Sequence, residues 1–230
     1  MAAFPASDER ARARSTAGSS AQNEADRRRR SRENRIRSAH PRLGGLLLAL
    51  SAEPPSTTAW ERGAEGERRV GAALDRLLAA DIGVLHDRRC PGTRANIDHL
   101  VVAASGIWIV DAKHYKGRVE QRNVGKWLST DIRLFVGGRD RTQLLDGLVR
   151  QRATIDHALE GTDVTDVPVH TVLCFVGGDW KLFAKPFALR SSLVTWPNAL
   201  YERIIAGGPV GTCRQRELLA AFERKLPPCA

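Results

Sequence analysis

The chain has 230 residues, which is long enough for one domain with extensions, and 42% of the residues are hydrophobic, which is enough to form a buried core. Its net charge of +10 favours polyanionic partners such as nucleic acid or an anionic membrane surface, without choosing between them. The four cysteines form no CxxC pair and have no zinc-ligand spacing with histidine, which argues against a zinc site. We therefore expect reduced thiols and a cytoplasmic protein.

The basic excess is concentrated near the N-terminus. Residues 1–42 hold 11 arginines and 5 acidic residues, whereas the rest of the chain holds 25 basic and 21 acidic residues. Residues 1–40 also contain very few large apolar side chains, so burial cannot offset the entropy of ordering them. We predict a disordered basic tail and linker over residues 1–58. The arginine run Arg27–Arg30 could bind phosphates non-specifically, or it could be a solvated or partly helical charged stretch.

One apolar segment, Leu43–Leu50, follows the tail, and the Pro-rich stretch Ala52–Thr58 after it has the composition of a linker. Leu43–Leu50 is too short to span a bilayer, and its charged lead is too long for a signal peptide. We expect no stable membrane insertion. A peripheral membrane contact by this segment, behind the arginine run, is an alternative.

The remaining sequence, residues 59–230, alternates helical and strand patterns and predicts one α/β domain, with a central mixed sheet flanked by helices. Helices are expected over residues 60–80, 142–159, 199–205 and 215–225. Strands are expected over residues 82–86, 96–103, 107–115, 119–121, 127–135, 169–177 and 193–196, with 169–177 in the centre because it is continuously apolar.

Two carboxylates lie on adjacent predicted strands. Asp111 and Lys113 are two residues apart in the strand 107–115 and therefore share a face. Asp98 lies in the preceding strand 96–103. A turn at Ser105–Gly106 predicts an antiparallel hairpin, and residues 98 and 111 are equidistant from its centre. We therefore expect Asp98 and Asp111 to lie close together.

Two carboxylates at this distance repel unless a cation neutralises them, and Mg²⁺ or Mn²⁺ accepts such oxygen ligands. The cation would stabilise charge on a phosphate and acidify a bound water, while Lys113 would orient that water or offset transition-state charge. The alternatives are that Asp98 is a solvated strand-edge carboxylate and that Asp111 and Lys113 form a weak surface ion pair.

Two polar residues interrupt the apolar stripes of predicted helices. Glu67 lies on or beside the stripe of the first helix, and Gln151 lies near Leu148 and Ile155 on the second. A polar side chain on a core-facing stripe needs a partner, and a metal or water shell at the strand ends would supply one. The alternative is a boundary position from which the polar group reaches water.

The motifs resemble the nuclease-related domain (NERD) family. The segments that carry this resemblance are GAEGERRV (Gly63–Val70), NIDHLVVAASGIWIVDAKHYKGRV (Asn96–Val119) and the helix that holds Gln151. The resemblance covers roughly residues 60–175. That family is similar to the PD-(D/E)XK nuclease superfamily, so the resemblance implies a restriction-endonuclease-like core and an endonuclease-type phosphodiesterase that uses Mg²⁺ or Mn²⁺.

By residue, the resemblance implies that Asp98 and Asp111 are the two motif acids and Lys113 the motif lysine. It assigns Glu67 to the acid of the first helix and Gln151 to the glutamine of the later helix. The implied metal ligands are the three acids. The second acid is more often glutamate in the family, and no Asn-Pro precedes Gln151 here.

Further contacts are expected around the acid strand. Tyr115, Lys116 and Arg118 could contact DNA phosphates where the chain leaves the sheet, or form an exposed charged turn at Gly117. His99 points to the face opposite Asp98 and is expected to pack or hydrogen-bond there. The function expected is phosphodiester hydrolysis in DNA. A catalytically inactive nucleic-acid-binding or regulatory module is the alternative, and the sequence sets no oligomeric state, although a dimer is compatible with it.

Overall fold

The computed structural model describes residues 16–40, 48, 55–80, 82–93, 95–127, 129–161 and 166–229. The helices are α2 (Ser19–Ala39), α4 (Pro55–Asp75), the short 3-10 helix η1 (Arg76–Ala80), α5 (Leu144–Leu159), α6 (Pro197–Ile204) and α7 (Thr212–Lys225). The strands are β1 (Gly83–Arg89), β2 (Asn96–Ala103), β3 (Gly106–Asn123), β4 (Ile132–Val136), β5 (Arg139–Asp140), β6 (Val169–Asp179), β7 (Phe187–Leu189) and β8 (Ser192–Thr195).

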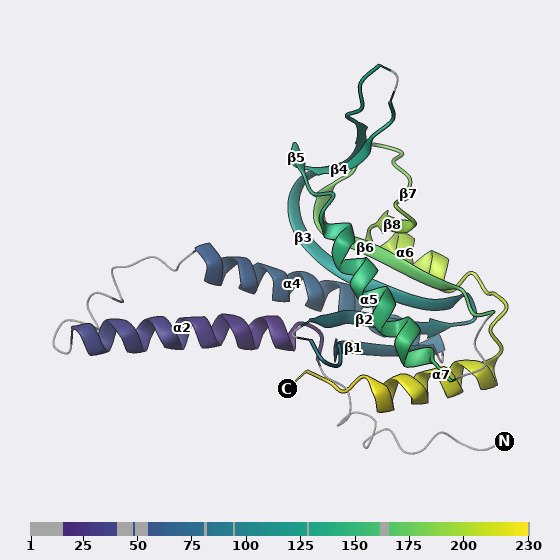
Figure 1. The fold of residues 1–230 in the computed structure, drawn as a ribbon, viewed down its shortest axis with the longest axis horizontal. Coiled ribbons are helices and arrows are strands. Elements are labelled where there is room, and N and C mark those ends of the chain that lie inside the picture. The colour runs from purple at the N-terminus through teal and green to yellow at the C-terminus, as the bar shows by residue number, and fades with distance from the viewer. Residues whose placement is uncertain are drawn as a thin grey trace.

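The strands of the described residues form one mixed sheet in the order β1-β2-β3-β6-β8-β7, and β4 pairs with the distal part of β3 and with β5 (Figure 1). The predicted α/β class with a central mixed sheet flanked by helices is confirmed. β6 pairs in parallel with both β3 and β8, and its middle residues, Val172–Cys174, are fully buried. The expectation of a central apolar strand over residues 169–177 is therefore correct.

Alternation along the strands divides the core into two layers. Ile107 and Ile109 pack with residues of α5 and α7 on one face of the sheet. Trp108 and Val110 pack on the other face with residues of α4 and α6. Because Asp111 continues the series of Ile107 and Ile109, its side chain leaves β3 on the α5 side.

The antiparallel hairpin predicted around Ser105–Gly106 is present. β2 and β3 pair in a register that runs from His99 opposite Val110 to Ala103 opposite Gly106. Continuing that register by one residue places Asp98 opposite Asp111, as the sequence predicted. The two carboxylates therefore emerge from adjacent strands at the same level of the sheet.

β3 differs from its prediction in length. It continues through the segment predicted as a separate strand, residues 119–121, and extends to Asn123. The pairing of β3 with β6 shifts register between His114 and Gly117, and Gly117 has φ 96°, which favours glycine. The following strand begins at Ile132 and not at residue 127, and the short edge strand β7 was not predicted.

The N-terminal segment also differs from its prediction. Residues 19–39 lie in the tail that was expected to lack order, but they form the helix α2, in agreement with the alternative of a helical charged stretch at Arg27–Arg30. Helix α4 begins at Pro55, inside the expected linker. Ala21 and Ala25 are buried where α2 lies along α4. The apolar segment Leu43–Leu50 falls outside the described residues except for Leu48. No helix in the described part of the chain combines the length and apolar character needed to cross a membrane.

Two glycines of α4 give a matched test of its packing against β3. A Cβ added at Gly66 would lie 2.8 Å from the Cβ of His114, whereas one added at Gly63 would meet nothing within 4 Å. We expect Gly66→Ala to lower the free energy of unfolding by about 1–3 kcal/mol through steric overlap. Gly63→Ala should raise it by roughly 0.5–1 kcal/mol because alanine favours the helix. Urea unfolding of both variants measures the difference, and equal effects would contradict the described helix–strand contact.

Candidate active site

The five residues expected to form the site come from four elements. Glu67 lies on α4, Asp98 on β2, Asp111 and Lys113 on β3, and Gln151 on α5. The three carboxylates and Gln151 are only 6% to 8% exposed, and the Lys113 side chain is 22% exposed. Neither a solvated strand-edge carboxylate nor a surface ion pair describes these groups. Their burial requires compensating partners.

Asp98 is fixed by a backbone hydrogen bond. The β2–β3 ladder ends at His99 and Val110, and the carboxylate of Asp98 accepts the next available amide, that of Ala112, at 2.9 Å. Burial raises the pKa of Asp98 well above its usual range, and the nearby charges of Asp111 and Glu67 raise it further. The hairpin thus holds Asp98 beside a second acid at an electrostatic cost.

Lys113 offsets part of that cost. Its Nζ lies 2.5 Å from Oδ1 of Asp111 and 3.3 Å from the carbonyl oxygen of Ala112. Burial opposes the charge of Lys113, but the carboxylates of Asp111 and Asp98 outweigh it and raise the pKa of Lys113 above its usual range. Lys113 is therefore a permanent cation at neutral pH and not a proton acceptor.

Glu67 reaches the site from α4, across the end of the strands. Burial raises its pKa to about 7, repulsion from Asp87 and Asp111 adds to the rise, and Lys113 partly opposes it. Its Oε2 is buried and has no hydrogen-bond partner among the described residues. A carboxyl group in this state can take up either a proton or a cation.

Gln151 approaches from the opposite layer, on α5. Its Nε2 donates to the carbonyl oxygen of Asn96 at 3.2 Å, two residues before Asp98. Its Oε1 is buried and lacks a partner within the described part of the chain. The amide is thus oriented by the backbone of β2 and leaves an oxygen acceptor unused.

These groups suit a hard divalent cation by their chemistry. Three carboxylates and one amide oxygen are ligands that Mg²⁺ and Mn²⁺ accept. Burial, together with repulsion from neighbouring acids, raises the pKa of Asp98 and of Glu67, and a bound cation would favour their charged forms. Within the described ranges, no three His, Cys, Asp or Glu side chains already stand in the arrangement of a metal site. Lys113 lies against Asp111 instead.

The residues that follow on β3 have different environments. Tyr115 is half-buried, its ring lies 6.2 Å from that of Phe175, and the guanidinium of Arg141 lies over it at 5.1 Å. Tyr115 is therefore a packing residue in this structure. Lys116 and Arg118 are exposed on either side of Gly117.

Asp87 was not anticipated as part of this region. It is fully buried on β1 with φ 48°, and it accepts hydrogen bonds from Asn96 Nδ2 at 2.7 Å and from Ser19 Oγ and the Ser20 amide at 2.6 Å each. In the sequence it stands before Arg88 and Arg89, which is typical of a charged strand end. No local signal marks it, because Ser19 and Ser20, two of its partners, lie 68 and 67 positions away in the chain.

His99 lies on the opposite face from Asp98, as predicted. Its Nδ1 lies 2.8 Å from Nδ1 of His86, whose Nε2 lies 2.9 Å from Asp75. Burial lowers the pKa of His99 well below its usual range, and His86 lowers it further. His99 is thus a neutral, hydrogen-bonded core residue in the α4 layer.

One comparison with known proteins gives a match. The family model described as the nuclease-related domain matches residues 62–176, which run from α4 to β6 and include all five candidate residues. Comparisons with curated proteins and with solved structures give no match. The match covers half of the chain and agrees with the geometry of the β2–β3 hairpin. The chain belongs to the nuclease-related domain family.

Proposed function

We propose that this protein is a metal-dependent nuclease that hydrolyses phosphodiester bonds in DNA. The observation that carries the proposal is the burial of Asp98, Asp111 and Glu67 around Lys113 at one end of the hairpin. Burying repelling carboxylates is unfavourable, and a fold tolerates it chiefly where a cation or a reaction uses them. Membership of the nuclease-related domain family supports the same conclusion.

Each residue has a distinct role in this proposal. Asp98, Asp111 and Glu67 would hold Mg²⁺ or Mn²⁺, with the Oε1 of Gln151 as a further oxygen ligand. The cation, when bound, polarises the scissile phosphate and acidifies a bound water. Lys113 keeps its positive charge and so stabilises negative charge that develops on the phosphate, or orients the attacking water.

Two exposed cations extend the site towards the substrate. Lys116 lies within the register shift of β3 and Arg118 just after it, a few residues beyond Lys113 on the same strand. They would bind backbone phosphates next to the scissile one, which positions DNA without reading its sequence.

The direct test is a cleavage panel. Full-length protein is incubated with linear, nicked, branched and single-stranded DNA in the presence of Mn²⁺, Mg²⁺ or EDTA. We expect cleavage of at least one form with either ion and none with EDTA. If every form stays intact with both ions at enzyme excess, the proposal of a nuclease is wrong.

A DNA-binding module without turnover is the second candidate. The observation that favours it is the ion pair between Lys113 and Asp111, which already neutralises one carboxylate. Calorimetric titration with Mn²⁺ separates the two. A nuclease should bind Mn²⁺, and Asp98→Ala should abolish that binding. A DNA-binding module should release no heat of binding on titration with Mn²⁺, and its affinity for DNA should be the same with and without the substitution.

A further inference from the structure

The helices α2 and α4 lie side by side in antiparallel directions and project together from the body of the domain (Figure 1). An ion pair joins Arg29 to Glu61, and the Arg28 guanidinium lies 5.6 Å from the centre of the Trp60 ring. We call residues 27–37 of α2, with the start of α4 behind them, the arginine arm. Contacts with α4 hold the arginine-bearing part of α2 in place.

The base of the arm is tied to the candidate site. Ser19 Oγ and the Ser20 amide donate to Asp87, and Asn96 Nδ2 donates to both Asp87 and Ser20 Oγ. The carbonyl oxygen of the same Asn96 holds Gln151. These contacts fix the start of α2 next to the strand that carries Asp98, so the arm runs away from the site in a set direction.

The surface charge of the arm exceeds what its own acids neutralise. Helix α2 contains three acidic residues and seven arginines, all seven between residues 27 and 37: Arg27, Arg28, Arg29, Arg30, Arg32, Arg35 and Arg37. Glu24, Glu33 and Glu61 pair with Arg27, Arg28, Arg29 and Arg37. Arg30 and Arg35 are exposed and form no ion pair with any described residue.

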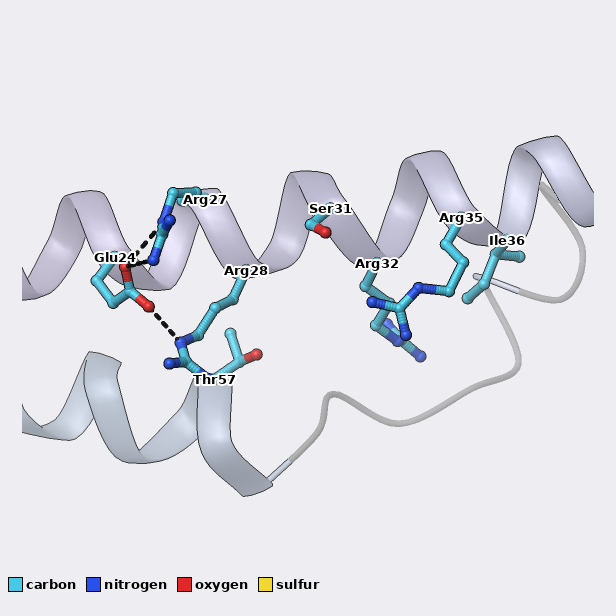
Figure 2. A pocket seen from close by; sticks show the side chains of 8 residues that line it. All are labelled: Glu24, Arg27, Arg28, Ser31, Arg32, Arg35, Ile36 and Thr57. Atoms are coloured by element: carbon cyan, nitrogen blue, oxygen red, sulfur yellow. Dashed lines mark hydrogen bonds and ion pairs between the residues drawn. The ribbon is translucent and has the colours of Figure 1, made fainter.

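Two shallow hollows, each of about 650 Å³, lie along this charged surface. Figure 2 shows the first, where Arg28, Arg32 and Arg35 extend from α2 towards the space beside the start of α4. Arg30 and Arg27 line the second. The side chains thus present guanidinium groups along the helix axis and not at a single point.

We propose that the arginine arm is a docking surface for the sugar–phosphate backbone of duplex DNA, which it guides along a line leading to the candidate site. At about 1.5 Å per residue, residues 27–37 extend over roughly 15 Å, the length of about four or five phosphates of one strand. That the polyanion is DNA rests on the proposed function. Guanidinium groups pair well with phosphate oxygens.

The surface of the arm does not suit a lipid bilayer. Helices that lie on membranes expose an apolar face, which sinks below the headgroups. In α2 the exposed residues are polar or small, and the buried alanines, Ala21 and Ala25, face α4. The exposed surface of the arm is therefore positively charged and has no apolar face, as is typical of surfaces that bind nucleic-acid backbones.

The test measures binding separately from cleavage. In full-length Asp111→Asn protein, the affinity for a labelled duplex of about 20 base pairs is followed by anisotropy between about 50 and 200 mM salt. Removing Arg30 and Arg35 together as Arg30→Gln/Arg35→Gln should weaken binding roughly 50-fold near 0.1 M salt and lower the log–log salt slope by about 1.8. Arg30→Lys/Arg35→Lys should keep the slope, because it keeps the charge.

The matched control is Arg203→Gln/Arg224→Gln, which removes the same charge from exposed positions on α6 and α7, away from the arm (Figure 1). Circular dichroism confirms that all variants stay folded. The proposal is overturned if Arg30→Gln/Arg35→Gln binds the duplex with the same affinity as the parent protein. It is also overturned if the control variant loses as much affinity as the arm variant. A loss seen only on phosphatidylserine vesicles, with DNA binding unchanged, also overturns it.

The two proposals fail separately in this design. If the arm variant loses duplex binding but wild-type protein cuts no DNA, docking stands and the nuclease proposal fails. If wild-type protein cuts DNA but the arm variant binds as well as its parent, the nuclease proposal stands and docking fails.

Discussion

Asp111→Asn should reduce Mn²⁺-dependent DNA cleavage by about 10³-fold or more, because it removes a charged ligand at the point where Asp98, Glu67 and Lys113 converge. The substitution keeps the size of the side chain and an oxygen acceptor for the Nζ of Lys113, and it relieves repulsion with Asp98, so the folded structure should persist. Initial rates on the best substrate of the cleavage panel, together with melting curves, measure both effects.

Two further variants sharpen this prediction. Asp111→Glu restores a carboxylate one methylene longer and should retain more activity than Asp111→Asn. Asp156→Asn, at a half-exposed position on α5 where Asp156 pairs with Arg152, should cut at the wild-type rate. Wild-type cleavage by Asp111→Asn with Mn²⁺ would show that the reaction occurs elsewhere in the protein.

Glu67→Gln should stabilise the metal-free protein at about pH 8 by up to about 3 kcal/mol. The pKa of Glu67 is about 7 in the folded protein, against 4.5 for an exposed carboxyl. Between these values the folded state binds more protons than the unfolded state, so stability falls as pH rises from about 4.5 to 7 and then levels off. Each pKa unit corresponds to about 1.4 kcal/mol, and glutamine removes this dependence.

Urea unfolding in EDTA between about pH 5 and 8 measures the effect. Glu65→Gln is the control on the same helix, since hydrogen bonds to Arg69 and Arg68 lower the pKa of Glu65. That variant should not gain stability at high pH. Saturating Mn²⁺ should stabilise the wild type more than Glu67→Gln. A wild-type stability that rises with pH across this window would contradict the buried state of Glu67.

The hairpin and its acids could be predicted because their information is local. The turn at Ser105–Gly106 between two apolar runs sets the centre of the β2–β3 hairpin, and that register brings Asp98 opposite Asp111. The stripes around Glu67 and Gln151 likewise marked them as polar residues in apolar surroundings. The sequence could not show that both keep a buried oxygen without a partner, which depends on how α4 and α5 approach the sheet.

The extent and packing of the N-terminal helix could not be predicted, because the contacts that hold it come from distant partners. The composition of residues 19–39 is typical of disordered segments. In the structure, however, Ser19 and Ser20 donate hydrogen bonds to Asp87, and Arg29 forms an ion pair with Glu61. Asp87, which accepts hydrogen bonds from Ser19 and Ser20, could not be recognised from the sequence for the same reason. Its role depends on residues about seventy positions away, and in the sequence it resembles any charged residue at a strand end.

The hydrogen bond between Asp98 and the Ala112 amide has an evolutionary consequence. That carboxylate accepts the amide next to the last pair of the β2–β3 ladder, so a residue inserted or deleted between the two acids would break this hydrogen bond and move core side chains from one layer of the sheet to the other. Such changes would be removed by selection for folding before catalysis is tested. Among relatives, the spacing between the two acids should therefore be inherited unchanged, while the connection between β3 and β4 is free to vary in length.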